Sequence, residues 1–426
     1  MKAGYKMTEL GELPEEWELV NLVKVASIKN SNVDKKSDKS EITIRLCNYM
    51  DVYNNDYISD KLNFMTATAK EEEINKFLLY QGDVIITKDS ETKEDIAKAT
   101  VVTENFKDVL CGYHLSLIRP SSDLEGVYLS KLFGLNIVKQ QLVRKANGTT
   151  RFGLNISVIQ DLLIPLPPLP EQEKIARILS TVDRKIEAIG AQIEQARVLK
   201  KGLLQRLLTR GIGHTRFKET ALGEVPEAWE VVELSSLAKC FVGIASSATH
   251  AYTDHGVLLI RNQNIKSGKI VLDDILMVDK EYEIQHKSKR LRAGDILTVR
   301  TGYPGISAVV PPELENCQSF TTLIVRRFKE IISSDFLCYY INSDLGKSFF
   351  ASGQAGGAQK NIGAKVLQKM KIIIPPLPEQ EKIAQILSTA DEKIDMLQAK
   401  QAAYRELKKG LMQQLLTGKI RVSPSP

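Results

Sequence analysis

The sequence predicts a mixed α/β (α+β) fold with two similar globular domains separated by a long antiparallel two-helix coiled coil, related by pseudo-twofold symmetry. The first observation behind this prediction is a repeat: residues 169–209 and 377–417 are identical at 26 of 41 positions without a gap. The second is a shorter repeat before each copy, LGELPEEWELVNL at residues 10–22 and LGEVPEAWEVVEL at residues 222–234. The segments between the repeats match poorly. A shared frame that carries two divergent domains explains these observations.

The repeat boundaries divide the chain, whose 426 residues exceed the size of one ordinary domain. We expect the following parts: a first globular domain at 1–168, a first repeated helix at 169–209, a linker at 210–221, a second globular domain at 222–376, a second repeated helix at 377–417 and a C-terminal tail at 418–426.

The composition is that of a soluble globular protein, with 43% hydrophobic and 26% charged residues. Runs of 18 or more apolar residues are absent, and the first 20 residues lack the apolar stretch of a secretory signal, so neither a membrane span nor secretion is expected. The five cysteines form no C-x-x-C motif and only five histidines accompany them. We therefore expect no metal and no disulfide framework, and a reducing cytoplasm as the location.

The net charge of +6 is unevenly distributed along the chain. Residues 1–168 carry 21 Lys and Arg against 24 Asp and Glu, which gives −3, and residues 169–218 carry 11 against 5, which gives +6. A globular domain that binds nucleic acid would therefore need local basic patches rather than a strong overall field.

Each long repeat predicts a helix that begins in the motif PPLPEQ. Pro170 and Pro378 suit the first helical turn because the missing N–H would be unpaired there. Glu171 and Glu379 place negative charge where the helix dipole favours it. About 40 residues at roughly 1.5 Å each make a rod of about 60 Å.

Apolar residues recur at alternating intervals of four and three along both helices, as in the seam of a coiled coil. The seam comprises Ile175, Leu179, Val182, Ile186, Ile189, Ile193, Leu203 and Leu207 in the first helix and Ile383, Leu387, Ile394, Leu397, Leu411 and Leu415 in the second. Lys200 and Lys408 interrupt the two seams at the same place. Each lysine either fixes the register of the pair or extends its ammonium group out to water. Because the second domain joins the end of one helix to the start of the other, paired helices should run antiparallel.

The divergent segments predict domains that are rich in strands early and helical late. Expected strands lie at 42–47, 83–87, 99–103 and 115–119 before a helix at 127–145, and at 257–261, 295–299, 307–310 and 321–327 before a helix at 335–351. The motifs GDVIIT and GDILTV, at 82–87 and 294–299, predict that the two domains share a fold.

Polar and basic loops at matching places in the two domains are candidates for nucleic-acid contacts, because Arg, Asn and Gln can each make two hydrogen bonds to a base edge. Lysines nearby could hold phosphates. The candidates are Lys88, Arg144, Asn147, Thr149, Arg151, Arg261, Asn262, Gln263, Arg300, Tyr303, Gln354 and Lys360. For any one of them, a solvated loop residue is the alternative.

The motifs of several enzyme classes are missing. No N/D-P-P-Y/F motif of an amino-methyltransferase is present, and LGKS at 345–348 lacks the upstream glycine of a P-loop because Ile341 stands there. Asp183 and Asp391 each begin a D-x-K fragment, which we interpret as helix-surface charge rather than a nuclease motif. We therefore expect no catalytic residues, no metal site and no cofactor.

The motif PPLPEQ followed by a long helix, present twice in 426 residues, resembles the specificity subunit of type I restriction–modification systems over the whole chain. The resemblance implies two target-recognition domains, each reading one half of a bipartite, asymmetric site in double-stranded DNA. It implies that the coiled coil sets the unread gap and docks two methylation subunits. Restriction subunits, which carry ATP-dependent translocation and cleavage, would join that complex, and this chain would itself be non-catalytic.

Two alternatives remain at this point. One is a coiled-coil scaffold whose end domains bind proteins and no nucleic acid. The other is a specificity subunit that serves a methylase without a nuclease partner. DNA affinity that falls steeply with salt would argue against the scaffold.

Overall fold

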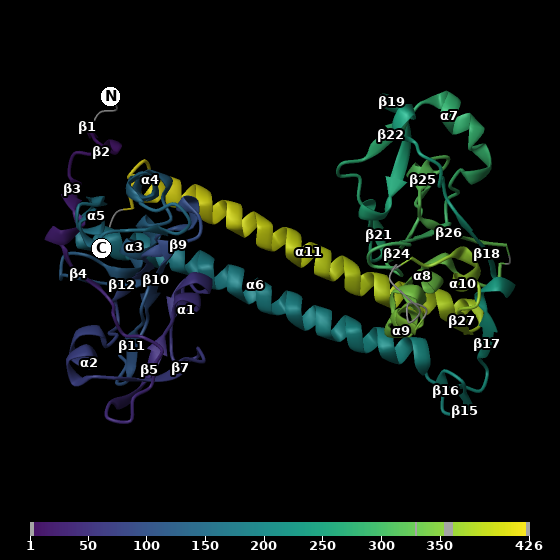
Figure 1. Cartoon of the computed structure of the whole chain (residues 1–426), viewed down its shortest axis with the longest axis horizontal. Helices are drawn as coiled ribbons and strands as arrows, with labels where there is room; N and C mark the ends of the chain where they lie inside the picture. Colours follow the sequence, from purple (N-terminus) through teal and green to yellow (C-terminus); the bar gives the residue numbers. More distant parts are fainter. Residues whose placement is uncertain (1–3, 329, 353–360, 423–426) are drawn as a thin grey trace. The chain divides into compact units, whose positions relative to one another are not determined.

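The computed structural model of the chain describes residues 4–328, 330–352 and 361–422. The chain forms two compact units, which Figure 1 shows coloured along the sequence. Unit 1 comprises residues 1–190 and 399–426, and unit 2 comprises residues 191–398. The division falls inside the two long helices, so each unit contains one end of each helix.

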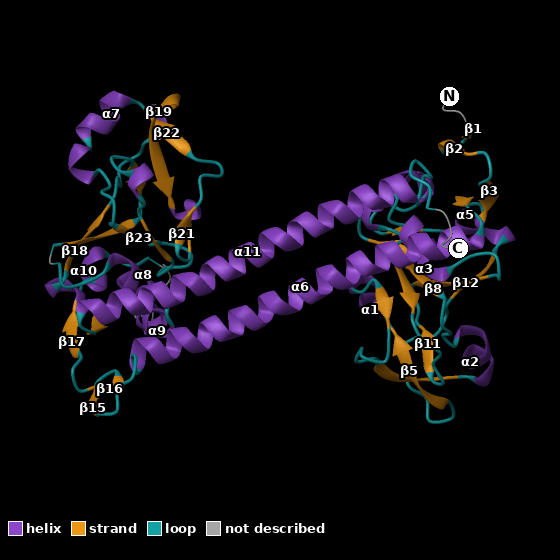
Figure 2. Ribbon diagram, turned by 180° about the vertical axis from the view of Figure 1, so that it is seen from behind, coloured by secondary structure: helices purple, strands orange, loops and turns teal. Residues whose placement is uncertain are grey.

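The two long helices are α6 (Leu169–Thr209) and α11 (Leu377–Leu415), drawn as continuous ribbons in Figure 2. The bounds of α6 are those predicted, whereas α11 ends two residues earlier than the predicted residue 417. Gly418, with φ of 66°, explains this end, because a glycine in the left-handed region commonly terminates a helix.

The helices pair antiparallel within each unit. In unit 1, Asp183 of α6 pairs with Lys408 of α11, and the Ile186 carbonyl accepts a hydrogen bond from the Gln401 amide at 3.3 Å. The residue number rises along α6 as it falls along α11, so the two helices run in opposite directions. In unit 2, Lys200 near the end of α6 pairs with Asp391 near the start of α11.

The apolar seam positions are covered to different degrees. Those less than 10% exposed are Ile175, Leu179, Val182, Ile189, Ile193, Leu207, Ile383, Leu387, Ile394, Leu397 and Leu415. Ile186, Leu203 and Leu411 are half-buried. Ile175 and Leu415 belong to the core of unit 1, and Leu207 and Ile383 to the core of unit 2. The helix ends are thus part of the cores of the two units.

Unit 1 contains a five-stranded sheet of order β4-β12-β8-β10-β6 and a three-stranded sheet of order β11-β5-β7. Its strands are β1 (Tyr5–Thr8), β2 (Gly11–Pro14), β3 (Glu18–Asn21), β4 (Ala26–Asn30), β5 (Ile42–Cys47), β6 (Tyr57–Ile58), β7 (Met65–Ala69), β8 (Val84–Thr87), β9 (Asp89–Ser90), β10 (Ala99–Val102), β11 (Val109–Cys111), β12 (Leu115–Pro120), β13 (Phe152–Gly153) and β14 (Leu163–Leu166). Its shorter helices are α1 (Tyr49–Asn54), α2 (Glu71–Phe77), α3 (Gly126–Leu132), α4 (Asn136–Lys145) and α5 (Ile156–Gln160).

Unit 2 contains a four-stranded sheet of order β18-β26-β23-β24 and a three-stranded sheet of order β22-β19-β25. Its strands are β15 (Phe217–Thr220), β16 (Gly223–Pro226), β17 (Glu230–Glu233), β18 (Ala238–Val242), β19 (Tyr252–Arg261), β20 (Ile265–Lys266), β21 (Lys269–Ile270), β22 (Leu276–Val278), β23 (Ile296–Thr298), β24 (Ser307–Val309), β25 (Gln318–Phe320), β26 (Leu323–Arg327) and β27 (Lys371–Ile374). Its shorter helices are α7 (Lys280–Gln285), α8 (Ser334–Asn342), α9 (Asp344–Ser352) and α10 (Ala364–Leu367).

The two units share their strand order, as the GDVIIT and GDILTV motifs predicted. These motifs form β8 and β23, which each lie inside the larger sheet. The order β4-β12-β8-β10 corresponds to β18-β26-β23-β24, and β6 is added in unit 1. The predicted strand at 42–47 is β5, and most other strand bounds differ from the prediction by one or two residues. The strand predicted at 257–261 is longer, because β19 begins at Tyr252.

The prediction of one long helix in each globular part is wrong, because the structure has two short helices in its place. The helix predicted at 127–145 is broken around Gly134, where a Cβ atom would lie 2.9 Å from the Met412 side chain of α11. The helix predicted at 335–351 is broken at Ser343, whose backbone is extended and whose hydroxyl accepts from the Gly346 N–H at 3.4 Å. Ser343 therefore acts as a cap for the second helix.

The segment predicted as a linker at 210–221 contains a β-strand. Its residues Phe217–Thr220 form β15, which pairs with β16 in an antiparallel hairpin. In unit 1, β1 and β2 form the same kind of hairpin from the N-terminal segment. The linker prediction is therefore corrected at Phe217–Thr220.

One carboxylate joins three segments of unit 1. The Trp17 side chain is fully buried, and its indole N–H donates to Glu171 at 3.0 Å, in the first turn of α6. Arg421, which follows α11, donates to the same carboxylate at 2.8 Å. The described part of the predicted tail at 418–426 is thus bound to the start of α6.

Unit 2 repeats this joint with the other ends of the helices. The Trp229 indole N–H donates to Glu379 at 3.0 Å, in the first turn of α11. The backbone N–H of Ile212, which follows α6, donates to Glu379 at 2.8 Å, and the His214 ring lies 2.9 Å from the same oxygen. The repeated Trp and Glu of the sequence are therefore the partners of one structural joint.

The glutamine of PPLPEQ holds each globular part through backbone atoms. Gln172 donates to the Asp123 carbonyl at 2.9 Å and accepts from the Glu125 N–H at 2.9 Å. Gln380 donates to the Ile331 carbonyl at 2.8 Å. Because backbone groups are common to all residues, this joint tolerates side-chain divergence in the globular parts.

None of the helices among the described residues is long and apolar enough to cross a membrane.

Candidate nucleic-acid interface

In unit 1, a polar loop returns to the end of the central strand β8. Asn147 and Gly153 exchange two backbone hydrogen bonds, of 3.1 and 2.8 Å, and so close a turn. Beside it, β13 pairs with β9, and the Leu154 N–H donates to the Lys88 carbonyl at 2.9 Å. The loop is thereby fixed next to Lys88, the first residue after β8.

The closed turn presents the predicted candidates Asn147, Thr149 and Arg151, which are all exposed. Arg144 is exposed in the last turn of α4, just before this loop. Burial raises the pKa of the Tyr49 phenol, and the charge of Arg151 acts on it in the opposite direction. Arg151 thus lies within electrostatic reach of α1.

Lys88 lies beside an aromatic pair that the sequence analysis missed. Its ammonium group is 5.1 Å from the centroid of the Tyr113 ring, which is 48% exposed. The Tyr113 and His114 rings are 4.0 Å apart, and the His114 Nδ1 pairs with the Asp89 carboxylate. A cation beside an exposed ring suits a phosphate and a base face.

The corresponding place in unit 2 is built around Arg300, which follows β23 as Lys88 follows β8. The Ile362 N–H donates to the Arg300 carbonyl at 3.1 Å, as Leu154 does to Lys88. Asn262 accepts from the Arg300 N–H at 3.3 Å and donates to the Thr301 hydroxyl at 2.9 Å. The structure thus brings Arg300 and Asn262 together.

Arg261 lies next to this pair. Its guanidinium donates to the Asp274 carbonyl at 2.5 Å, and the Nε atoms of Arg261 and Arg300 are buried without a partner among residues 4–328, 330–352 and 361–422. Gln263 is exposed, and Tyr303 is 80% exposed. The remaining candidates, Gln354 and Lys360, lie outside the described residues.

A backbone feature at the same position in both units gave no signal in the sequence. His114 precedes β12 with φ of 71°, and Thr321 precedes β26 by two residues with φ of 52°. Non-glycine residues in the left-handed region are strained, and such residues gather at functional sites. Histidine and threonine both occur mostly outside this region, so composition and periodicity could not reveal it.

Several cations near these strands are paired within the protein. Arg326 of β26 donates to Asp295 of the GD motif at 2.6 Å, and Arg119 of β12 donates to the equivalent Asp83 at 2.7 Å. Both aspartates are almost completely buried. These arginines stabilise the sheet rather than extend toward a ligand.

The two aspartates of the D-x-K fragments are not ordinary surface charges. Asp183 is 8% exposed and accepts from the Tyr57 hydroxyl at 2.8 Å as well as from two lysines. Asp391 is half-buried and accepts from Tyr339 at 2.9 Å. The interpretation as helix-surface charge was therefore wrong for Asp183. Among the described residues, no three His, Cys, Asp or Glu side chains are grouped so that they could hold a metal ion.

Comparisons with known proteins agree with this architecture. Residues 14–196 and 226–403 match the family described as type I restriction modification DNA specificity domain. The MjaX protein of Methanocaldococcus jannaschii, provisionally named a type I restriction enzyme specificity subunit, is 30% identical over 98% of this chain and 97% of its own length. The MjaVIII specificity subunit of the same organism is 28% identical over 96% of this chain and 94% of its length.

A solved structure shows the same fold at low sequence identity. The S subunit of a type I restriction–modification system from M. genitalium superposes with a TM-score of 0.58 at 15% identity, over 94% of this chain and 96% of that one. The duplicated family match and the relatives that cover nearly the full length lead to one conclusion. This chain belongs to the family of type I restriction–modification DNA specificity subunits.

Proposed function

We propose that the chain is the DNA sequence-specificity subunit of a type I restriction–modification complex, with residues 1–168 and 222–376 as its two target-recognition domains. One observation carries the proposal: in both units a cation follows the same central strand, and its carbonyl accepts the same backbone hydrogen bond, from Leu154 to Lys88 and from Ile362 to Arg300. The side chains around that place differ, with Tyr113 in one unit and Asn262 in the other. Because the two units share this backbone arrangement but differ in the side chains around it, they are suited to recognising two different half-sites.

Six of the candidates have roles in this proposal that follow from their chemistry. Lys88 and Arg144 hold phosphates and set position, since ammonium and guanidinium groups bind phosphate oxygens without reading sequence. Asn147 and Arg151 face base edges in the first half-site, and Asn262 and Arg300 in the second. Thr149, Arg261, Gln263 and Tyr303 lie within or beside the same loops, as do Gln354 and Lys360 in the sequence.

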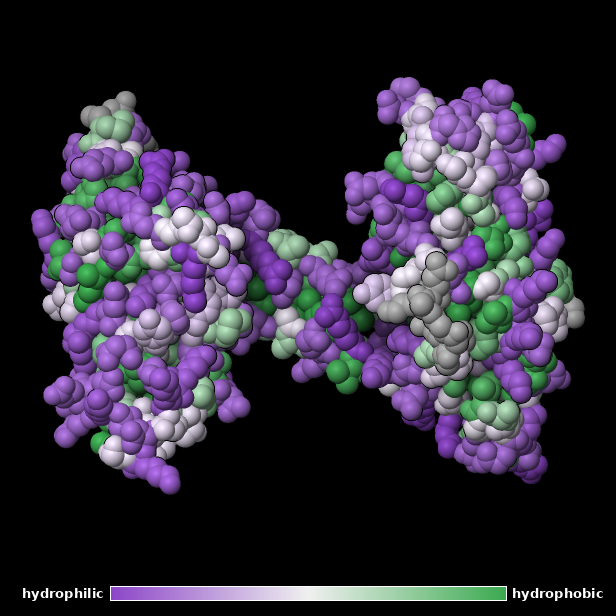
Figure 3. Space-filling model, viewed as in Figure 1, coloured by the Kyte–Doolittle hydropathy of each residue, from purple (hydrophilic) through white to green (hydrophobic). Residues whose placement is uncertain are grey.

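The remaining parts of the chain would serve assembly. We propose that α6 and α11 set the number of unread base pairs and dock two methylation subunits. Exposed apolar side chains on α6 support a protein partner, since Val198 is 73% and Leu199 is 62% exposed. Figure 3 shows hydrophobic side chains among hydrophilic ones along the helices. Methyl transfer, ATP-driven translocation and cleavage would belong to partner subunits, and this chain would be non-catalytic.

Salt dependence of DNA binding tests the proposed function. The chain reconstituted with its methylation subunit should bind duplex DNA with an affinity that falls steeply as salt rises, because bound lysines and arginines release counterions from phosphates. Fluorescence anisotropy from low to physiological salt measures this. An affinity that is independent of salt and sequence would instead favour a scaffold with protein-binding end domains.

Co-purification with or without a restriction subunit distinguishes the full complex from a methylase-only complex.

Two alanine substitutions should distinguish a residue that binds phosphate from a residue that recognises a base. Lys88→Ala should weaken binding to all duplexes alike and lower the salt slope by about one, whereas Arg300→Ala should cost about 1–3 kcal/mol on the cognate site and relax the choice of base in the second half-site. The control is Lys24→Ala, since Lys24 is exposed next to β3 and outside these loops. Arg300→Ala binding that retains parental discrimination at every base would contradict its assigned role.

A further inference from the structure

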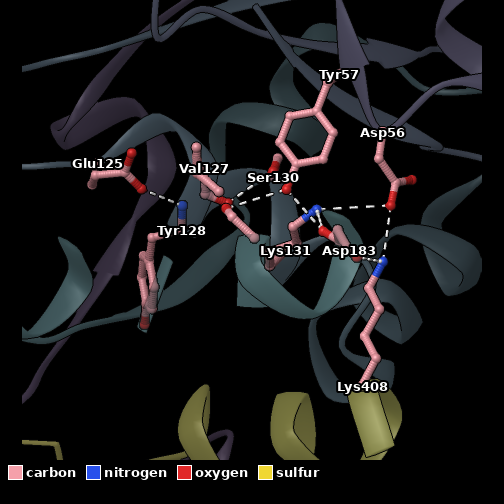
Figure 4. Close-up of polar contacts among 10 residues, drawn as sticks. Asp56, Tyr57, Glu125, Val127, Tyr128, Ser130, Lys131, Asp183 and Lys408 are labelled. Atoms are coloured by element: carbon pink, nitrogen blue, oxygen red, sulfur yellow. Dashed lines mark hydrogen bonds and ion pairs between the residues drawn. The ribbon is translucent and has the colours of Figure 1, made fainter. Parts of the chain in front are cut away.

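Four charged groups and a tyrosine meet where α6, α11 and the globular part of unit 1 come together, and we call Asp56, Tyr57, Lys131, Asp183 and Lys408 the first ionic layer (Figure 4). Asp183 of α6 accepts from Lys408 of α11 at 2.6 Å and from Lys131 of α3 at 2.7 Å. The hydroxyl of Tyr57, from β6, donates to the same carboxylate at 2.8 Å. Three elements therefore converge on one buried side chain of α6.

A second carboxylate completes the charge balance of this layer. Asp56 lies 2.8 Å from the Lys408 ammonium and 3.8 Å from that of Lys131. Burial opposes ionisation of Asp56, but Lys131 and Lys408 overcome it and lower the pKa of this carboxyl. Burial likewise opposes the charge of Lys408, and Asp56 and Asp183 raise the pKa of its ammonium group. Asp56 and Lys408 are therefore charged at neutral pH.

Unit 2 has a simpler equivalent, which we call the second ionic layer: Lys200, Tyr339 and Asp391. Lys200 of α6 pairs with Asp391 of α11, and the Tyr339 hydroxyl of α8 donates to Asp391 at 2.9 Å. The Lys200 ammonium is also 5.6 Å from the centroid of the Tyr339 ring. Burial raises the pKa of the Tyr339 phenol, which keeps it a hydrogen-bond donor.

The two layers use equivalent residues of the repeat. Asp183 and Asp391 occupy the same column, as do Lys200 and Lys408, and each lysine pairs with the aspartate of the other helix. The apolar seam repeats every seven residues, so a slip by one heptad would again bring apolar residues together. Such a slip would separate both lysines from their aspartates and leave partly buried charges unpaired, which is strongly unfavourable.

We propose that Asp183, Asp391, Lys200 and Lys408 are positioning residues that fix the axial register of α6 against α11. The first layer also holds Lys131 and Tyr57, so it ties the first globular domain to the same register, whereas the second layer adds only Tyr339. The consequence for DNA rests on the proposed function: the register fixes how many base pairs separate the half-sites.

Disulfide trapping measures the register without DNA. A Cβ atom at Gly190 of α6 would lie 3.0 Å from the Gln401 side-chain amide of α11, so Gly190→Cys and Gln401→Cys place thiols at facing positions of the two helices in the native register. The five natural cysteines are all buried, which limits competing disulfides. Crosslink yield in the full chain under mild oxidant, resolved by electrophoresis, is then the readout.

Charge reversal in this background tests the proposal. Lys200→Glu combined with Lys408→Glu should reduce the crosslink yield several-fold. The matched control is Arg197→Glu, because Arg197 is an exposed cation of α6 that pairs with Glu194 of its own helix. Lys200→Glu alone should also reduce the yield, and the exchange Lys200→Asp with Asp391→Lys should restore it, which a general loss of helix would not allow.

The outcomes separate the register from the proposed function. A parental yield in the double charge reversal, or an exchange that fails to restore the yield while far-UV circular dichroism is unchanged, would overturn the register proposal. If the yields change as expected but the parent chain with its methylation subunit binds no DNA, the register stands and the proposed function fails. Where modification occurs, the charge-reversed chain should lose it or give a mixture of gap lengths.

Discussion

Replacing Trp229 with alanine should lower the free energy of unfolding of unit 2 by about 3–5 kcal/mol, the usual cost of truncating a large buried aromatic side chain. The Trp229 side chain is fully buried in the core that contains Leu207 of α6 and Ile383 of α11. Its indole N–H donates to Glu379 at 3.0 Å. The substitution therefore opens a cavity where the two helix ends meet and also removes one partner of the Glu379 carboxylate.

A conservative variant separates packing from the hydrogen bond. Trp229→Phe retains most of the ring but leaves the half-buried Glu379 carboxylate one donor short, so it should cost less, about 1–3 kcal/mol. Urea unfolding followed by far-UV circular dichroism measures both variants. Because the chain has two tryptophans, the fluorescence of Trp17 then reports on unit 1 alone. An alanine variant with the parental midpoint would contradict the role assigned to this joint.

Exchanging residues 23–168 for the corresponding segment of another family member should change one half of the recognised DNA site completely and leave the other half unchanged. The exchanged segment contains the whole candidate interface of unit 1, including Lys88 and Arg151. Gln172, outside it, holds the segment through the backbone of Asp123 and Glu125, which any sequence supplies. The joint should therefore survive the exchange.

The control for this exchange is the reciprocal one in the second domain. Replacing residues 235–376 should alter the other half-site and leave the first, because Gln380 makes equivalent bonds to the Ile331 carbonyl and the Ser333 N–H. Sequencing of methylated DNA from cells carrying each hybrid identifies both half-sites. A single exchange that altered both halves would show that the domains do not read independently.

The two long helices could be predicted from the sequence because the patterns that specify them are repeated. A seven-residue apolar period and a Pro-Glu start specify a helix almost regardless of surroundings, and the predicted bounds of α6 were correct. The breaks at Gly134 and Ser343 were missed because the apolar pattern continues across them. At Gly134 a Cβ atom would meet the Met412 side chain, almost 280 residues away in the chain, and periodicity does not report such a neighbour.

The candidate interface was predictable only in part. Lys88 and Arg300 follow strands that the motif GD makes recognisable, so their equivalence could be anticipated. Tyr113 and His114 could not, because their place depends on how β11 pairs with β5 and β12 pairs with β8. The same holds for Asp183, whose surroundings come from β6, α3 and α11. Tertiary contacts turned an apparently ordinary surface charge into a buried one.

Modification mapping of the parent chain is the direct test of whether its two domains recognise a bipartite DNA site. The chain is expressed with its methylation subunit in a host without other modification systems, and methylated adenine or cytosine is located by single-molecule sequencing. We expect one bipartite site, with two different half-sites separated by a gap of constant length. A continuous site, a site whose two halves are identical, or a gap that varies freely would contradict it.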